Sequence, residues 1–267
     1  QPVNDDKVRG KPEKFADHYS QARLFFESQS PVEQQHIIRA FRFELTRVQT
    51  PAIRERVVSQ LVNVSPDLAG AVADGLGMKV PEAQPMVLAK LPRAEVRKSQ
   101  ALSLFARPGE GTIRTRRIAI VVAPGIDGEA VGALQKALAA AGAVPRLVGA
   151  KLGPVRTHKG KPLEVDVTLE AAPSVLFDAV ILPDIASAEE TSAPGHTMEF
   201  LKDQYRHGKA ILAIGSGGGL LEAAKIPQTL PSGETDPGIL TVAAREVESM
   251  MTNFVGGVGH HRDFEGQ

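Results

Sequence analysis

The stretch I-L-A-I-G-S-G-G-G-L-L-E-A-A at residues 211–224 has the residue types that a reactive or binding turn needs. Four apolar residues lead into a glycine-rich corner that contains Ser216, and a pattern typical of a helix follows. Many α/β proteins present a nucleophile or hold a phosphate at such a strand–turn–helix junction. The corner is therefore the first candidate for chemistry in this chain.

The two phosphate-binding patterns are not met at this corner. A P-loop places lysine and a hydroxyl directly after its last glycine, whereas Leu220 and Leu221 follow here. The dinucleotide fingerprint lies on the first strand–helix turn of its domain, and this corner follows the fourth expected strand. We therefore expect no phosphate site.

Ser216 is a poor match to a catalytic serine. The G-x-S-x-G elbow is broken, because Ile214 and Ala213 do not fit the pattern. Four histidines are candidate bases, but nothing in the sequence pairs any of them with Ser216: His196, His207, His260 and His261. The simpler interpretation is a tight turn whose glycines let the strand and the helix pack closely.

Two further stretches raise the question of a ligand. Asp127 follows the first expected strand, where open α/β sheets bind ligands, but it is equally placed to cap the next helix, and we favour capping. His260 and His261 are adjacent, so their side chains point apart on a helix or a strand and chelate a metal poorly. We expect a solvated tail there and no metal site.

The composition excludes several classes of protein. The 267 residues carry 31 Lys plus Arg and 31 Asp plus Glu, and this balance gives no reason to expect nucleic acid or an anionic membrane as partner. No transmembrane run and no secretory signal are recognisable. The absence of cysteine excludes disulfides and thiolate sites and fits a cytoplasmic protein. Because the sequence starts at Gln1, we expect a piece of a longer chain.

The elements that must position these residues fall into two parts. Residues 30–79 are expected to be helical, with Ser30, Thr50 and Ser65 each capping a helix that starts at a proline. Glu33 completes a capping box with Ser30.

The flanking segments have no sustained periodicity. Residues 1–29 are polar, and we expect an extended arm there. Residues 80–115 contain several prolines and are predicted to be an interdomain linker.

Residues 116–267 alternate apolar strands with helices, which predicts an α/β domain with a doubly wound parallel sheet. A flavodoxin-like strand order is the expected topology. The expected strands are 116–123, 144–150, 177–184, 210–215 and 238–244, and the expected helices are 128–142 and 196–208.

These two parts together resemble a known family. Residues 24–78, from L-F-F-E-S-Q-S-P to G-L-G-M, resemble the helical segment that follows the haem barrel in catalases. The stretches R-R-I-A-I-V-V-A-P-G, A-P-S-V-L-F-D-A-V-I-L-P-D and A-I-L-A-I-G-S-G-G-G-L-L resemble the C-terminal extension of large-subunit haem catalases. The resemblance covers nearly the whole chain in the right order.

That extension is similar to the class I glutamine amidotransferase and PfpI-like superfamily, in which the elbow reads roughly A-I-C-H-G-P-x-L-L. This likeness places Gly215 at the position of the cysteine nucleophile and Ser216 at the position of the histidine. The acidic residue of the superfamily falls near Asp127. The resemblance therefore implies a vestigial pocket around Asp127, Gly215 and Ser216 that does not react.

The residues of catalase chemistry are also missing from this chain. Haem catalases bind iron through a tyrosinate with an arginine four residues earlier, whereas Tyr19 and Tyr205 have Phe15 and Leu201 at that spacing. The distal histidine and asparagine motifs have no counterpart. We therefore expect no cofactor in this chain, and haem in the missing part of the parent catalase.

The resemblance implies the C-terminal region of a catalase that decomposes hydrogen peroxide in oxidative-stress defence. This region itself would be non-catalytic and contribute stability, subunit packing or control of haem-channel access. Its partners would be the haem-barrel part of the same chain and the other subunits of a homotetramer. Two alternatives remain: a holdase-type chaperone that binds unfolded client proteins through the PfpI-like domain, and a stand-alone hydrolase or glyoxalase-like enzyme.

Overall fold

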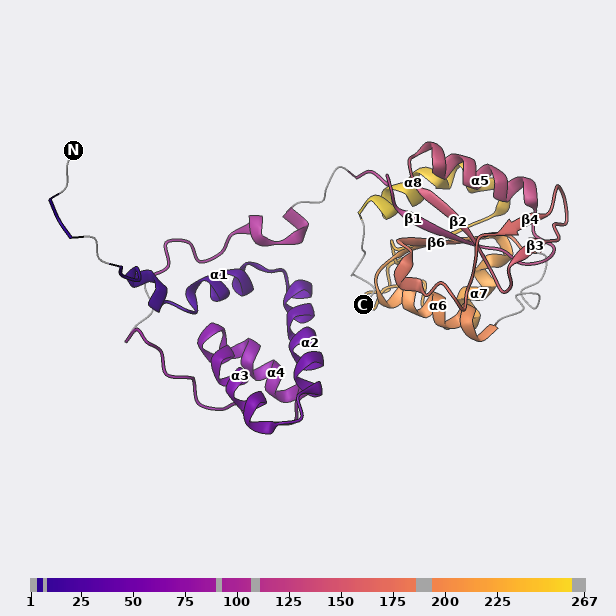
Figure 1. Cartoon of the computed structure of the whole chain (residues 1–267). Helices are drawn as coiled ribbons and strands as arrows, with labels where there is room; N and C mark the ends of the chain where they lie inside the picture. The colour runs from indigo at the N-terminus through magenta and orange to yellow at the C-terminus, as the bar shows by residue number, and fades with distance from the viewer. Residues whose placement is uncertain (1–3, 7–8, 90–92, 107–110, 186–193, 261–267) are drawn as a thin grey trace. The chain divides into compact units, whose positions relative to one another are not determined.

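The structure is a computed structural model that describes residues 4–6, 9–89, 93–106, 111–185 and 194–260. The chain forms two compact units, residues 1–107 and residues 108–267 (Figure 1). No helix in the described part of the chain is both long and apolar enough to cross a membrane.

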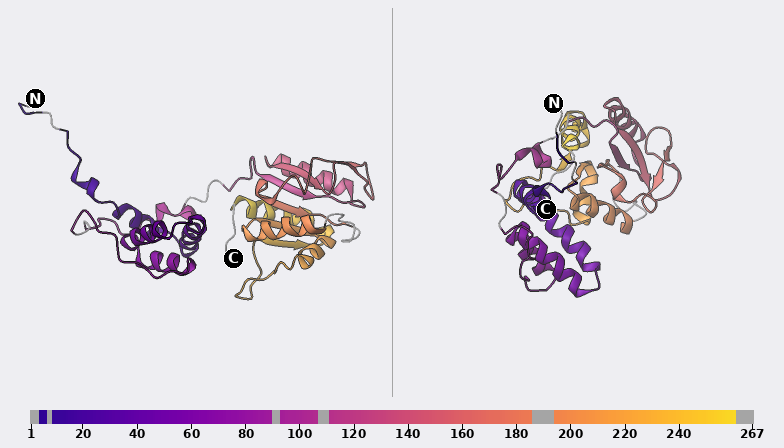
Figure 2. Two further views of the ribbon diagram at one scale, coloured as in Figure 1. Left: turned by 60° about the horizontal axis from the view of Figure 1, so that its bottom comes forward. Right: turned by 60° about the vertical axis from the view of Figure 1, so that its left-hand side comes forward.

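The first unit is helical, as predicted for residues 30–79. Its α-helices are α1 (Ser20–Ser28), α2 (Pro31–Arg47), α3 (Pro51–Val64) and α4 (Pro66–Gly75), and its short 3₁₀ helices are Glu13–Ala16, Gln100–Leu102 and Leu104–Ala106. The four α-helices gather into one body in every view (Figure 2). They bury an apolar cluster that consists of Phe26, Ile38, Leu45, Val58, Leu61, Leu68, Ala69, Val72 and Ala73.

Two of the three predicted helix caps are present. The Ser30 hydroxyl accepts a hydrogen bond from the Glu33 amide, and the Glu33 carboxylate accepts one from the Ser30 amide, so the predicted capping box is confirmed. The Ser65 hydroxyl accepts a hydrogen bond from the Leu68 amide. Thr50 makes no such bond, so that prediction is wrong, although Pro51 still starts the helix.

The extended arm predicted for residues 1–29 is wrong over its last third, which forms helix α1. Phe26 enters the apolar cluster and is 6% exposed. The Arg23 guanidinium donates hydrogen bonds to the backbone carbonyls of Asn63 and Val64, at 2.7 and 3.2 Å. These carbonyls lie at the C-terminal end of α3, where no backbone amide of the same helix can donate to them. Helix α1 therefore covers the apolar cluster and also supplies hydrogen-bond donors to the end of α3.

The linker predicted for residues 80–115 is also wrong in part, because residues 99–104 are bonded to the helical unit. The two oxygens of the Glu33 carboxylate accept hydrogen bonds from the Leu104 amide (2.7 Å) and the Ser103 hydroxyl (2.9 Å). The Ser99 amide donates to the Ser28 hydroxyl at 2.9 Å. One glutamate therefore both caps α2 and fastens a segment about 70 residues away in sequence.

The second unit contains the predicted parallel sheet. Its strands lie in the order β5 (Val167–Thr168), β2 (Val144–Gly149), β1 (Arg117–Val121), β6 (Ala179–Leu182), β7 (Ala210–Ile214) and β8 (Ile239–Val242), and all neighbours are parallel. A separate antiparallel pair consists of β3 (Gly153–Val155) and β4 (Leu163–Val165). The sequence predicted every strand of the sheet except β5, and it missed β3 and β4, because these strands have only two or three residues.

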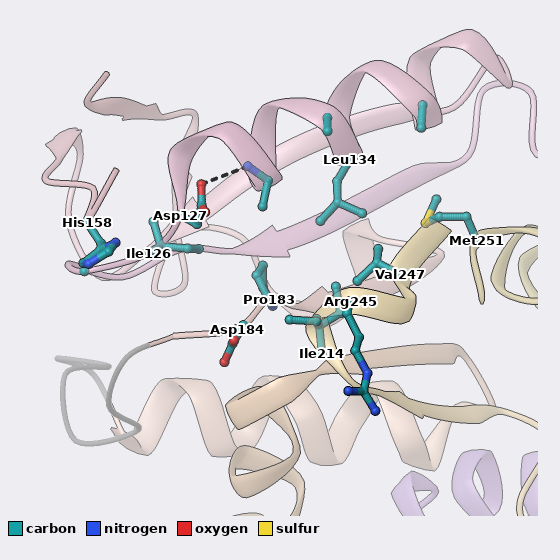
Figure 3. A pocket seen from close by; sticks show the side chains of 15 residues that line it. Ile126, Asp127, Leu134, His158, Pro183, Asp184, Ile214, Arg245, Val247 and Met251 are labelled. Atoms are coloured by element: carbon teal, nitrogen blue, oxygen red, sulfur yellow. Dashed lines mark hydrogen bonds between the residues drawn. The ribbon is translucent and has the colours of Figure 1, made fainter. Parts of the chain in front are cut away.

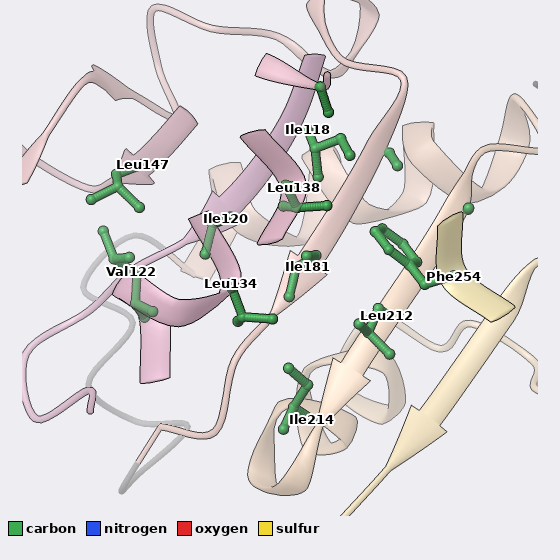
Figure 4. Packing of buried hydrophobic residues seen from close by; sticks show 14 of the residues in the cluster. Ile118, Ile120, Val122, Leu134, Leu138, Leu147, Ile181, Leu212, Ile214 and Phe254 are labelled. Atoms are coloured by element: carbon green, nitrogen blue, oxygen red, sulfur yellow. The ribbon is translucent and has the colours of Figure 1, made fainter. Parts of the chain in front are cut away.

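Helices cover both faces of this sheet (Figure 1). Helices α5 (Gly128–Ala140) and α8 (Val247–Gly259) pack on one face, and α6 (Pro194–Arg206) and α7 (Gly218–Ala223) pack on the other. Figure 4 shows the first layer, in which Ile118, Ile120, Leu134, Leu138, Leu212 and Phe254 interdigitate. The neighbours Ala119 and Val121 point to the opposite layer because successive strand residues alternate between faces.

Candidate functional site

The glycine corner is a sharp elbow between β7 and α7. Gly215 has a φ of +53°, which side chains rarely tolerate, and a short 3₁₀ turn (Gly215–Gly217) leads into α7. A Cβ on Gly215 would lie 2.6 Å from the Cγ of Asp184. A Cβ on Gly217 would collide with the backbone carbonyl of Leu182. Glycine is therefore required at both positions by the close approach of the last residue of β6 and of Asp184 in the segment that follows it.

Ser216 is bonded to that same segment. Its backbone amide donates a hydrogen bond to Oδ1 of Asp184 at 2.9 Å, and its hydroxyl lies 2.8 Å from the same oxygen. The hydroxyl oxygen also accepts a hydrogen bond from the Ile185 amide at 2.8 Å and contacts the Ile185 carbonyl. The polar atoms of Ser216 thus hold the end of β6 against the elbow.

No histidine among the described residues is a partner of the Ser216 hydroxyl. The described residues that the hydroxyl contacts are Asp184 and Ile185. His207 follows α6 and precedes β7, so a five-residue strand separates it from the elbow at the other end. His261 lies outside the described residues. The general base that a serine nucleophile needs is therefore not provided by the histidines that the structure describes.

Asp127 is a helix cap, which is the interpretation favoured from the sequence. Its carboxylate accepts hydrogen bonds from the backbone amides of Glu129 (2.9 Å) and Ala130 (3.1 Å) in the first turn of α5. The negative charge at this position also interacts favourably with the positive end of the helix.

A cavity of about 620 Å³ lies at the carboxyl ends of β1, β6, β7 and β8, between α5 and α8 (Figure 3). The polar side chains among its described lining residues are those of Asp127, His158, Asp184 and Arg245. Gly215 and Ser216 are not among the described lining residues. Asp184 does line the cavity, and Ser216 donates a hydrogen bond to its carboxylate. The cavity is thus lined by Asp127 and by Asp184, the hydrogen-bond partner of Ser216.

Sequence reasoning named Asp127 at this cavity and missed Asp184. The signal was present, since Asp184 ends the predicted strand 177–184 and so belongs at the same edge of the sheet. His158 and Arg245 come from connections that carry no recognisable motif.

A model of the C-terminal domain found in long catalases matches residues 114–265, which is more than half of the chain. The chain belongs to this family. A second model, described as catalase-related immune-responsive, matches residues 12–76 of this long-catalase chain. The family resemblance drawn from the sequence is confirmed.

Individual long catalases agree with this assignment. The chain is 41% identical to catalase HPII of Pseudomonas putida over 82% of its length, and 35% identical to catalase HPII of Mycobacterium avium over 98%. It is 33% identical to catalase-1 of Neurospora crassa over 93%. The aligned part is 31% of the length of the Pseudomonas putida protein, 37% of the Mycobacterium avium protein and 34% of the Neurospora crassa protein. The chain thus spans about a third of the length of these relatives.

The tyrosines of this long-catalase chain are placed in helical surroundings. Tyr19 is the residue before α1, and Tyr205 lies in α6. Burial and then the charge of Asp236 raise the pKa of the Tyr205 phenol above its ordinary value. A tyrosinate iron ligand requires the opposite shift, because the phenol must lose its proton. Among the described residues, no group of three or more His, Asp or Glu side chains is placed to hold a metal.

Proposed function

We propose that the chain is the C-terminal region of a large-subunit haem catalase, and that the whole protein decomposes hydrogen peroxide to water and oxygen in the cytoplasm. The observation that carries the proposal is the order of the two family matches, residues 12–76 and then 114–265. Relatives named as catalases align with 82–98% of the chain. Haem would then be held by the part of the parent protein that precedes this region.

The region itself is non-catalytic in this proposal. The elbow supports it, because the nucleophile position implied by the superfamily carries Gly215 and the Asp184 carboxylate occupies the space of a side chain there. Ser216 lacks a histidine base among the described residues. Asp127, Gly215 and Ser216 are then a vestigial site, with no cofactor of their own.

The flavodoxin-like and PfpI-like assignment of the second unit is part of the same proposal. Leaving out the two-residue β5, the sheet order β2-β1-β6-β7-β8 is 2-1-3-4-5 in chain order, which is the order of flavodoxin-like domains. The cavity lies where the order reverses, outside the carboxyl ends of β1 and β6.

The distribution of exposed apolar side chains supports a packing role for the helical unit. Eleven of the fifteen exposed large apolar side chains in the described residues belong to residues 1–107, among them Phe15 (66% exposed), Phe43 (56%) and Leu104 (70%). Where such side chains form a contiguous patch, they mark an interaction site. The haem-barrel part of the parent and the neighbouring subunits of a homotetramer are the partners we propose for it.

The chaperone alternative places client binding on the α/β unit. The exposed large apolar side chains described there are Val144, Leu152, Val175 and Leu176, and only the last two are adjacent in sequence. This smaller set favours packing by the helical unit over client capture by the α/β unit.

The experiment uses the full-length product of the gene, including whatever the reading frame encodes before Gln1. We expect the full-length protein to bind haem and to evolve oxygen from hydrogen peroxide. A variant that stops at Arg107 should keep the haem spectrum but melt at a lower temperature or lose its assembly. A reading frame that encodes no haem-binding part, or a full-length protein without peroxide turnover, would overturn the proposal.

A further inference from the structure

The cavity between α5 and α8 has an apolar end and a polar end. In Figure 3, Leu134, Val247 and Met251 lie toward the two helices, whereas His158 and Asp184 lie near the ends of the strands. Its volume of about 620 Å³ is in the range of small-molecule sites, roughly 300–1,000 Å³. The cavity therefore suits an elongated molecule whose two ends differ in polarity.

Small side chains on α5 create the apolar end. Ala130, Ala133 and Ala137 are spaced three and four residues apart, so they share one face of the helix and line the cavity. They face a wall that includes Val247 and the flexible, polarizable Met251. Among the described residues that line the cavity there is no Phe, Tyr or Trp, so this end suits an alkyl chain better than a stacked ring.

The charges at the polar end favour a cationic head group. The described lining residues include two carboxylates, Asp127 and Asp184, and one guanidinium, Arg245, so their formal charge is −1 when histidine is not counted. Asp127 is already committed to two backbone amides of α5. The Arg245 side chain is 85% exposed, and its Nε lies 3.6 Å from Oε1 of Glu246. Its positive charge is therefore partly offset by Glu246.

Asp184 is the carboxylate that can accept a further hydrogen bond. Both of its hydrogen bonds from Ser216 go to Oδ1, and Oδ2 has no partner among the described residues. Because Ser216 fixes the carboxylate, little conformational entropy is lost when Oδ2 accepts a further hydrogen bond. Ser216 is a positioning residue in this arrangement.

We propose that this cavity is a binding site for an aliphatic primary amine, with the alkyl chain between α5 and α8 and the ammonium group paired with Asp184. This site goes beyond the proposed function, because it binds a ligand without transforming it. An alkanoate of the same length is disfavoured by the net negative lining, and an alkanol lacks the charge.

The test is a titration of the full chain with butylamine and hexylamine at neutral pH, followed by amide NMR shifts, with hexanoate and hexanol as comparison probes. We expect saturable shifts at Ala133, Leu134 and Val247. Each added CH₂ should tighten the Kd by up to about fourfold, the equivalent of about 0.8 kcal/mol for full burial. Hexylamine should bind about tenfold more tightly than hexanoate. Shifts that do not saturate, or hexanoate that binds as tightly, would overturn the proposal.

Two variants separate the two ends of the site. Ala133→Phe fills the apolar end and should abolish binding, whereas Ala139→Phe, an exposed position on the same helix outside the cavity, should leave the Kd unchanged. Asp184→Asn should weaken hexylamine binding by roughly two- to fivefold, because Asp184 is exposed, and leave hexanol binding unaffected. Equal effects of the two phenylalanine variants would show that the alkyl chain binds elsewhere. That comparison holds even if Asp184→Asn does not fold.

Discussion

The backbone amide of Ser216 and its hydroxyl both contact one oxygen of Asp184, at 2.9 and 2.8 Å. The two residues follow the neighbouring parallel strands β7 and β6, which pair as far as Leu182 and Ala213. The hydrogen bonds therefore continue the link between the strands beyond the sheet. The hydroxyl next to the nucleophile position of the superfamily therefore fixes the segment that follows β6.

Gly215→Ala should destabilise the α/β unit by about 1–3 kcal/mol, because φ is +53° and the new Cβ would lie 2.6 Å from Asp184. Urea unfolding of the full chain, followed by a probe in the α/β unit, measures this loss. Gly218→Ala is the matched control, since a Cβ there meets nothing within 4 Å and lies in α7, and it should be neutral or stabilising.

Asp184→Gly should recover part of that loss in the Gly215→Ala background, because it removes the carboxylate that obstructs the Cβ. The backbone strain at residue 215 would remain. If the losses from the two substitutions simply add in a double-mutant cycle, the steric conflict between residues 184 and 215 is not the cause.

Ser216→Ala should lower the stability of the α/β unit by about 1–3 kcal/mol, because the amide of the buried Ile185 loses its acceptor. Ser232→Ala, at an exposed position, is the comparison and should change stability by less than about 0.5 kcal/mol. No esterase, amidase or glyoxalase turnover should depend on Ser216. A parent activity abolished by this substitution would make Ser216 catalytic.

Glu33→Gln should destabilise the helical unit by about 1 kcal/mol at neutral pH, since the carboxylate caps α2 and fastens residues 103 and 104. Burial by itself raises the pKa of Glu33, but hydrogen bonds from Ser30, Leu104 and Ser103 outweigh it and lower the pKa below 4.5. The stabilisation by this group is therefore present above pH 4.5 and is lost as the pH falls through the lower, folded-state pKa.

The pH dependence of this difference is the check. Unfolding curves of the parent and of Glu33→Gln should converge as the pH is lowered below 4.5. A difference that is constant from pH 7 to pH 3 would mean that the ionised carboxylate is not the source of the stabilisation.

The two units should unfold in separate calorimetric transitions, because residues 1–107 and 108–267 have separate apolar cores. The buried cluster of the helical unit is smaller, so we expect its transition at the lower temperature. One sharp transition whose calorimetric and van't Hoff enthalpies agree for the whole chain would contradict independent folding.

The sequence predicted the elements that bury continuous or periodic apolar residues. Strands β1, β6 and β7 are runs such as Ala210–Ile214 that are buried on both faces, so their pattern is unambiguous. Helix α1 was not predicted, because its apolar residues Leu24, Phe25 and Phe26 are adjacent and do not recur at helical spacing. The buried one, Phe26, is buried by a tertiary contact with the apolar cluster of the helical unit.

The site was predictable to a lesser degree. The position of Asp127 at the carboxyl edge of the sheet follows from the strand–helix pattern, and its role as a cap follows from its place before α5. The hydrogen bonds between Glu33 and Leu104 and between Ser216 and Asp184 join residues 71 and 32 positions apart. The spacing of residues within one segment of sequence cannot predict such distant pairs.

We propose that this region carries no peroxide chemistry, and the most direct test is to add one equivalent of haem to the purified chain and to measure oxygen release from hydrogen peroxide. We expect the absorption spectrum of free haem and no oxygen beyond the rate of haem alone. A Soret band at near-stoichiometric occupancy together with peroxide turnover would show that the chain carries the catalytic machinery itself, contrary to its proposed role as a non-catalytic C-terminal region.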